Sequence, residues 1–215
     1  FWGRDNYFVM DVGNPSPPFQ PGHSHCDALS YEISFAGRRV VVDSGCGSYT
    51  DPEIREYCRK TSSHNVPWLS PHEQSEIWGV FRMARRSEIS KRLFSPEKNL
   101  IEAELKDYSG NRFSRKVYLQ AERNAVEVVD SILENRTGGT FESIIHFSPE
   151  FEIFSEAPNM ILISSPELKL SLFSDTSHVV EDSRYFPEFG LEIRNRRVRF
   201  LGGDWRIIRY VIRQN

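Results

Sequence analysis

Short runs of β-branched and aromatic residues, separated by turn signals, recur through most of this 215-residue chain. Such runs are typical of strands, and strands at regular spacing with little helix favour an antiparallel sandwich. We therefore predict an all-β protein, a large antiparallel β-sandwich built by residues 1–215 as a single domain. The expected strands cover residues 6–12, 28–35, 39–43, 76–89, 99–107, 112–119, 125–133, 140–147, 160–164, 168–173, 191–200 and 205–212.

One short helix is expected within this pattern. Asp51 is a favourable N-cap residue, and Pro52 suits the first helical position, so the helix should span Pro52–Arg59. Ala36 and Gly37 should form the turn of a hairpin between two of the expected strands.

Composition excludes several classes of function. The formal net charge is −3, so no basic field points to nucleic acid, and no apolar run approaches the ~18 residues of a membrane span. The three cysteines form no CxxC pair, and their odd number argues against a disulfide framework, while one bridge with one free thiol stays open as an alternative. No signal-peptide pattern is visible at the start. The first residue is Phe1 rather than Met, which indicates a processed chain or a segment of a longer protein, and we expect a segment.

Four polar residues stand out because of their surroundings. His23 and His25 are two residues apart, a spacing that points both rings the same way in an extended segment. Asp43 ends the apolar run 40–42, where a carboxylate is costly unless it is paired or bound to a cation. His64 precedes another apolar stretch. Two imidazoles and one carboxylate, with an open fourth position, form a known zinc arrangement.

These residues alone leave a second interpretation open, in which the histidines are ordinary surface residues and Asp43 caps a turn. A two-residue turn at Ala36–Gly37 would place Asp43 opposite Ser30. His25 would then lie about 17 Å further along at ~3.3 Å per residue. A shared ion therefore requires a bend or bulge near residues 26–28.

Four ordered motifs carry a resemblance to a known family. Taken together they resemble the C-terminal β-sandwich domain of the heparinase II/III-like polysaccharide lyases, although Cys26 replaces the small residue usual at its position. The motifs are 22–31 (GHSHCDALSY), 41–45 (VVDSG), 63–65 (SHN) and 74–79 (QSEIWG).

The resemblance implies roles for individual residues. It implies a structural metal, Zn²⁺ or another divalent cation, on His25, Asp43 and His64. It also implies that His23 faces the substrate cleft. A catalytic tyrosine in the loop before the SHN motif corresponds best to Tyr49, with Tyr57 as the second candidate. Asp27 is then a candidate to hold the outer nitrogen of an imidazole ligand.

The activity implied by the resemblance is β-elimination at a uronic acid within an acidic polysaccharide. Such a reaction needs a base for the C5 proton, an acid for the departing O4 and neutralisation of the C5 carboxylate. His23 is expected to carry a proton or meet that carboxylate, and Tyr49 to act as the acid. Arg82 and Arg85 are candidates to bind uronate carboxylates, with a solvated strand face as the alternative. Trp68 and Trp78 are interpreted as core residues.

The resemblance also implies a second domain, because lyases of this family carry an N-terminal α/α toroid that completes the substrate cleft. The chain contains no such helical repeat, so the toroid of the same enzyme is the expected partner, and the 215 residues alone should be inactive or nearly so. The nature of the substrate favours a periplasmic or secreted location.

Two other functions compete with a lyase domain. A non-catalytic carbohydrate-binding module would expose coplanar aromatic rings without a polar cleft. A cupin-like metal enzyme would also carry a His-x-His pair and a distant histidine, usually with a carboxylate a few residues after the pair, a position that Asp27 only partly matches.

Overall fold

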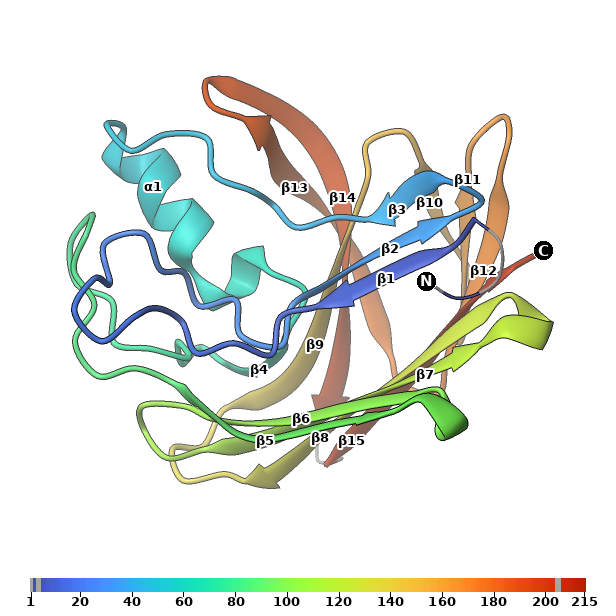
Figure 1. The fold of residues 1–215 in the computed structure, drawn as a ribbon. Coiled ribbons are helices and arrows are strands. Elements are labelled where there is room, and N and C mark those ends of the chain that lie inside the picture. The colour runs from blue at the N-terminus through green and yellow to red at the C-terminus, as the bar shows by residue number, and fades with distance from the viewer. Residues whose placement is uncertain (1, 3–4, 204–205) are drawn as a thin grey trace.

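A computed structural model describes residue 2, residues 5–203 and residues 206–215 of the chain. Two large antiparallel sheets face each other, as predicted (Figure 1). The first sheet has the order β1 (Tyr7–Met10), β2 (Tyr31–Phe35), β3 (Arg38–Val41), β9 (Thr140–Phe147), β14 (Leu191–Gly203) and β13 (His178–Glu188), with β4 (Pro67–Ser70) also paired to β9.

The second sheet contains eight strands in one continuous path. Its order is β10 (Glu152–Ala157), β11 (Met160–Ser164), β12 (Lys169–Ser174), β15 (Ile207–Gln214), β8 (Ala125–Glu134), β7 (Arg112–Gln120), β6 (Leu100–Lys106) and β5 (Glu88–Ser95). Short 3₁₀ turns occur at Thr61–Ser63, Pro96–Lys98 and Ala121–Arg123.

The core lies between the inward faces of the two sheets, because alternate residues of each strand point the same way. Tyr31, Ile33 and Phe35 of β2 are all almost fully buried there. Val126 and Val128 of β8 meet them from the second sheet as members of the same buried cluster. None of the helices in the described residues is long and apolar enough to cross a membrane.

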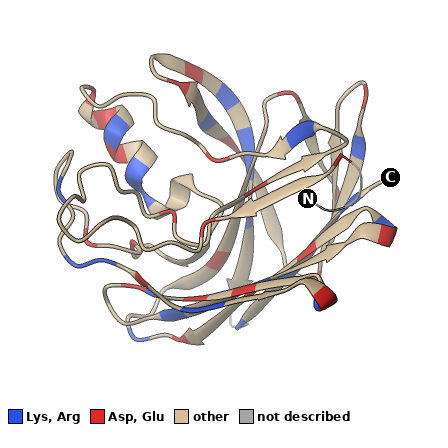
Figure 2. Cartoon of the chain, in the orientation of Figure 1, with Lys and Arg blue, Asp and Glu red and all other residues tan. Residues whose placement is uncertain are grey.

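The helix α1 spans Pro52–Arg59, as the sequence predicts. The Asp51 side chain accepts hydrogen bonds from the backbone N–H groups of Glu53 and Ile54, at 2.9 and 3.2 Å. The helix and the long loops around it lie at one end of the sandwich, while the two chain ends lie towards the other (Figure 1). Acidic and basic residues are interspersed over both sheets and the helix (Figure 2).

Some expected strands were wrong. Of the predicted strand 76–89 only the last two residues belong to β5, and residues 76–87 form an irregular hairpin instead. Strands β4, β10 and β13 were not expected. The predicted strand 205–212 begins at Trp205, which lies outside the described residues, while β15 begins at Ile207.

The predicted hairpin at Ala36–Gly37 is confirmed, with left-handed φ values of 49° and 75° and with Phe35 opposite Arg38. An irregularity between Ile33 and Ser34 places Ile33 opposite Val41, one residue out of the simple register. β3 then ends at Val41, and the chain continues through Asp43 to the helical end of the sandwich.

Candidate functional site

A sharp reversal between residues 26 and 30 creates the site. The Ser30 N–H donates to the Asp27 carbonyl at 2.8 Å, and Leu29 adopts a left-handed φ of 71°. The side-chain amide of Gln74 holds both backbone groups of Ala28, at 3.1 and 3.0 Å. A bend near residues 26–28 was expected from the strand register, and this reversal provides it. It returns His25 towards β3.

Three side chains form a group with metal-ligating potential. One ligand atom from each of His25, Asp27 and His64 lies within 4.8 Å of the other two. The rings of His25 and His64 are 5.4 Å apart between centroids. Asp43 is not a member of this group, but its Oδ2 lies 2.7 Å from His64 Nδ1. The structure thus brings the two predicted histidines together and offers two carboxylates beside them.

The Asp43 carboxylate is firmly held. It accepts hydrogen bonds from the Gly45 N–H at 2.9 Å and from Ser30 Oγ at 3.3 Å, besides its contact with His64. Burial acts to raise its pKa, but the His64 imidazole outweighs burial and leaves the pKa well below its ordinary value. Gly45 is required beside it, because its φ is +79° and a Cβ there would lie 2.1 Å from the Phe186 carbonyl oxygen.

The two histidines of the group differ in charge. Burial opposes charging of His64, yet the adjoining Asp43 carboxylate raises its pKa to about 9. Burial, the neighbouring His64 and the Arg55 guanidinium lower the pKa of His25 to about 3. His25 is therefore neutral at ordinary pH, as a metal ligand must be.

His23 and Tyr49 form a second, exposed pair. His23 Nδ1 lies 2.9 Å from the Tyr49 hydroxyl, within hydrogen-bond distance. The Tyr49 ring makes edge contacts with Phe81 and Phe189, both of which are about half exposed. Tyr57, the other candidate, points elsewhere, since its hydroxyl lies 3.0 Å from Ser183 Oγ on β13. Two groups able to exchange a proton thus face solvent beside the histidine group.

Two arginines of α1 hold these loops in place. Both Arg55 and Arg59 are fully buried, one helical turn apart. Arg59 donates to the carbonyl of Ser24, between the two predicted histidines, and to the carbonyls of Gly79, Val80 and Arg82 in the hairpin that follows. Neither arginine was predicted as a site residue, although their i, i+4 spacing beside Cys58 is the pattern of a buried helix face.

The two arginines expected to bind substrate differ. Arg85 is held by Glu76 through two bonds, at 2.8 and 3.1 Å, so its charge is already countered. Arg82 lies over the Trp78 ring at 4.6 Å from its centroid, and no ion pair of Arg82 occurs among the described residues. Trp78 is 51% exposed, so its interpretation as a core residue was wrong.

Asn65, the third residue of the SHN motif, has a structural role. Its side chain donates to the carbonyls of Tyr31 and Val42 and accepts from the His146 N–H, which ties β2, β9 and the segment after β3 together. The buried Arg115 of β7 reaches across the core and donates to the carbonyls of Leu29 and Asn65. The second sheet therefore supports both the reversal and the His64 segment.

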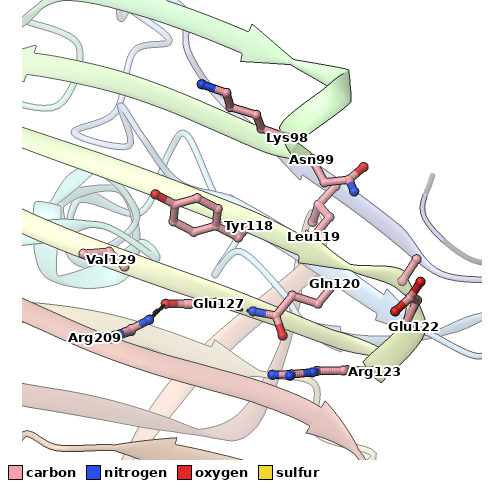
Figure 3. A pocket seen from close by; sticks show the side chains of 11 residues that line it. Lys98, Asn99, Tyr118, Leu119, Gln120, Glu122, Arg123, Glu127, Val129 and Arg209 are labelled. Atoms are coloured by element: carbon pink, nitrogen blue, oxygen red, sulfur yellow. Dashed lines mark hydrogen bonds and ion pairs between the residues drawn. The ribbon is translucent and has the colours of Figure 1, made fainter.

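Among the hollows that the described residues form, two differ in their relation to the histidine group. One, of about 400 Å³, is lined by Asp11, Asp27, Glu32 and Asp43 and opens the carboxylate side of the histidine group. A groove of about 710 Å³ lies on the second sheet (Figure 3). Its Glu127 is paired with Arg209 and with Gln120, and no predicted site residue lines it.

The residues present fit a divalent cation. Two imidazoles and two carboxylates suit zinc. The Asp27 carboxylate accepts no hydrogen bond from another described residue, and burial raises its pKa. His64 Nε2 is buried without a hydrogen-bond partner in the described part of the chain. Uncompensated groups of this kind are stabilised by a cation.

Similar folds occur among solved lyase structures. The heparan sulfate lyase HepC from Pedobacter heparinus is 16% identical with a TM-score of 0.76, over 97% of this chain and 33% of that one. The heparinase III product of BT4657 is 22% identical with a TM-score of 0.74, over 98% and 32%. The chain therefore spans about a third of the length of these structures. A comparison with curated proteins gave no match.

These structures show that the chain has the β-sandwich fold of a domain in solved lyases. The sequence matches the family described as "Heparinase II/III-like, C-terminal" over residues 3–210. The chain belongs to that family, as its four motifs indicated.

Proposed function

We propose that this chain is the C-terminal domain of a lyase that cleaves a uronic-acid-containing polysaccharide by β-elimination. The observation that carries the proposal is the exposed His23–Tyr49 pair, 2.9 Å apart, beside a group of metal-ligating side chains. Heparan sulfate is the first substrate to test, because HepC, which shares the fold, is a heparan sulfate lyase.

The reaction requires two proton transfers, one away from C5 of the uronic acid and one to the departing O4. A base removes the C5 proton, its electron pair forms the C4–C5 double bond, and the C4–O4 bond breaks with its pair leaving on O4. Tyr49 donates a proton to O4, and His23 accepts the C5 proton or returns one to Tyr49 through their hydrogen bond. Arg82 provides a cation for a substrate carboxylate, because no acidic partner is bonded to it among the described residues.

A structural Zn²⁺, or another divalent cation, would be held by His25 and His64 together with the carboxylate of Asp43, Asp27 or both. It would supply positive charge that fixes the loops carrying His23 and Tyr49. The acidic hollow at Asp27 and Asp43 supports entry of a cation from that side.

The aromatic side chains support a lyase over a simple binding module. Tyr49 meets Phe81 and Phe189 at interplanar angles of 64° and 77°, so these rings form no flat platform, and a polar pair lies among them. Membership of the heparinase II/III-like family also favours a lyase domain over a cupin-like metal enzyme.

The proposal includes an N-terminal helical domain of the same enzyme as partner and a periplasmic or secreted location. The test measures unsaturated uronate by ultraviolet absorbance with heparan sulfate as substrate. The full-length enzyme should release it, and the 215 residues alone should release little or none. Absence of product from the full-length enzyme with every uronate polymer tried would overturn the proposed reaction.

A further inference from the structure

Arg55 is a buried cation without an acidic partner. Its side chain is fully buried, and no carboxylate forms an ion pair with it in the described residues. The guanidinium donates to the Gly22 carbonyl at 2.9 Å and to Cys46 Sγ at 3.4 Å, while its Nε has no partner there. Burying a guanidinium without a carboxylate costs free energy, which indicates that Arg55 has a role beyond packing.

The shortest hydrogen bond of Arg55 is with a proposed metal ligand. Arg55 Nη1 lies 2.6 Å from His25 Nε2. A guanidinium can only donate, so Nε2 must be the acceptor and Nδ1 must carry the ring hydrogen. In that tautomer Nε2 is already used and Nδ1 has no free lone pair. A metal can bind His25 through either nitrogen only if Arg55 releases the ring.

The same guanidinium also touches the exposed pair. Its Cζ lies 4.9 Å from the centre of the Tyr49 ring and 5.8 Å from that of Phe81. Tyr49 in turn contacts His23 through its hydroxyl. Arg55 is thus the one described side chain that bonds to His25 and stacks on Tyr49.

We propose that Arg55 is a positioning residue that competes with the metal for His25 and couples metal loading to the His23–Tyr49 pair. In the metal-free protein Arg55 holds His25. When the metal binds, electrostatic repulsion and loss of its acceptor release the guanidinium from His25, and it stays on the Tyr49 side as a positive charge beside the cleft. The inference rests on the metal site of the proposed function.

Zinc affinity tests the competition directly. The 215-residue chain, Arg55→Met and Arg59→Met are titrated with zinc against a chromophoric chelator. Arg59 is the matched control, because it is equally buried on the same helix face but bonds only to carbonyl groups. Arg55→Met should bind zinc at least about tenfold more tightly than the unchanged chain, since a like charge and a competing donor are removed. Arg59→Met should not bind more tightly. Unchanged or weaker binding by a folded Arg55→Met overturns the proposal.

A second measurement needs no variant to fold. In protein labelled with ¹⁵N-arginine, one equivalent of zinc should shift the side-chain resonance of Arg55 and leave that of Arg59 in place. A resonance of Arg55 that ignores bound zinc also overturns the proposal. If the unchanged chain binds no zinc but Arg55→Met does, Arg55 excludes the metal and the proposal holds in its strongest form. If neither binds, the metal site itself fails, and the inference fails with it.

Discussion

The Asp43 carboxylate and the His64 imidazole meet at 2.7 Å at the junction between the sandwich and its loops. His64 is fully buried, whereas the Asp43 side chain is 27% exposed. In the metal-free protein a proton on His64 is what makes this contact favourable. The pair therefore couples stability to proton binding and, in the proposed metal site, to the binding of a cation.

The stability of the metal-free chain should depend on pH in a defined direction. The pKa of folded His64 is about 9 against an ordinary value of 6.5. Its contribution is thus complete below about pH 6.5 and is lost as the pH rises through 9. Asp43, whose pKa is lowered, contributes above its ordinary 3.8 and loses that contribution in strong acid. Urea unfolding of chelator-treated protein should show a decrease of about 2 kcal/mol between pH 6.5 and 9.5.

Asp43→Asn is the control for this pH dependence, because it removes the charge that raises the pKa of His64. The variant should be less stable at pH 6.5 and nearly independent of pH up to 9.5. An unchanged slope in Asp43→Asn would contradict the assignment.

Removing a carboxylate should reveal which one binds the metal. The geometry groups Asp27, rather than Asp43, with His25 and His64, while Asp43 is occupied by three hydrogen-bond contacts. Asp27→Asn and Asp43→Asn should each weaken zinc binding, by about 10- to 100-fold where the residue only orients a ligand and by more where it is the ligand itself. Isothermal titration of both variants ranks them. Full affinity in either variant would remove that residue from the site.

Loss of the Tyr49 hydroxyl should affect chemistry and leave metal binding intact. In the full-length enzyme, Tyr49→Phe should decrease elimination by at least about 100-fold, the usual contribution of a positioned acid. Tyr57→Phe is the matched control, since its hydroxyl faces β13. Equal activity of Tyr49→Phe and the unchanged enzyme, measured by ultraviolet absorbance, would exclude Tyr49 as the acid.

The buried ion pair of the core should be essential for stability. Arg115 and Asp130 are both fully buried and joined by two bonds, of 2.7 and 2.6 Å. Arg115→Met alone should cost about 3–5 kcal/mol of unfolding free energy, because it leaves a buried carboxylate unpaired. The double variant Arg115→Met/Asp130→Leu should recover part of this loss. Arg85→Ala on the surface should unfold at the same urea concentration as the unchanged chain.

Local signals predicted part of the fold well. The helix Pro52–Arg59 and the strands Thr140–Phe147 and Met160–Ser164 match the expected limits, because a capping residue or a dense β-branched run defines each of them. β13 was missed because its charged residues mask the strand pattern. In the structure they pair with charges on β14, as Asp182 does with Arg196.

The sequence identified the polar residues of the site but not how they meet. A left-handed backbone conformation is unfavourable for leucine, and no local sequence motif predicts it. Leu29 adopts it because Asp11 and Gln74, distant in sequence, hold the backbone on either side. Arg55 was missed for a similar reason, since an arginine on a short helix is ordinarily solvated and only the surrounding loops bury it.

Arg115 belongs to one sheet, yet the carbonyl groups that it fixes, those of Leu29 and Asn65, lie next to residues of the proposed metal site. We therefore expect the proposed metal site to be complete only while the two sheets are packed against each other. Bound zinc would consequently report on the integrity of the whole domain, and its release during denaturation should coincide with separation of the sheets rather than precede it.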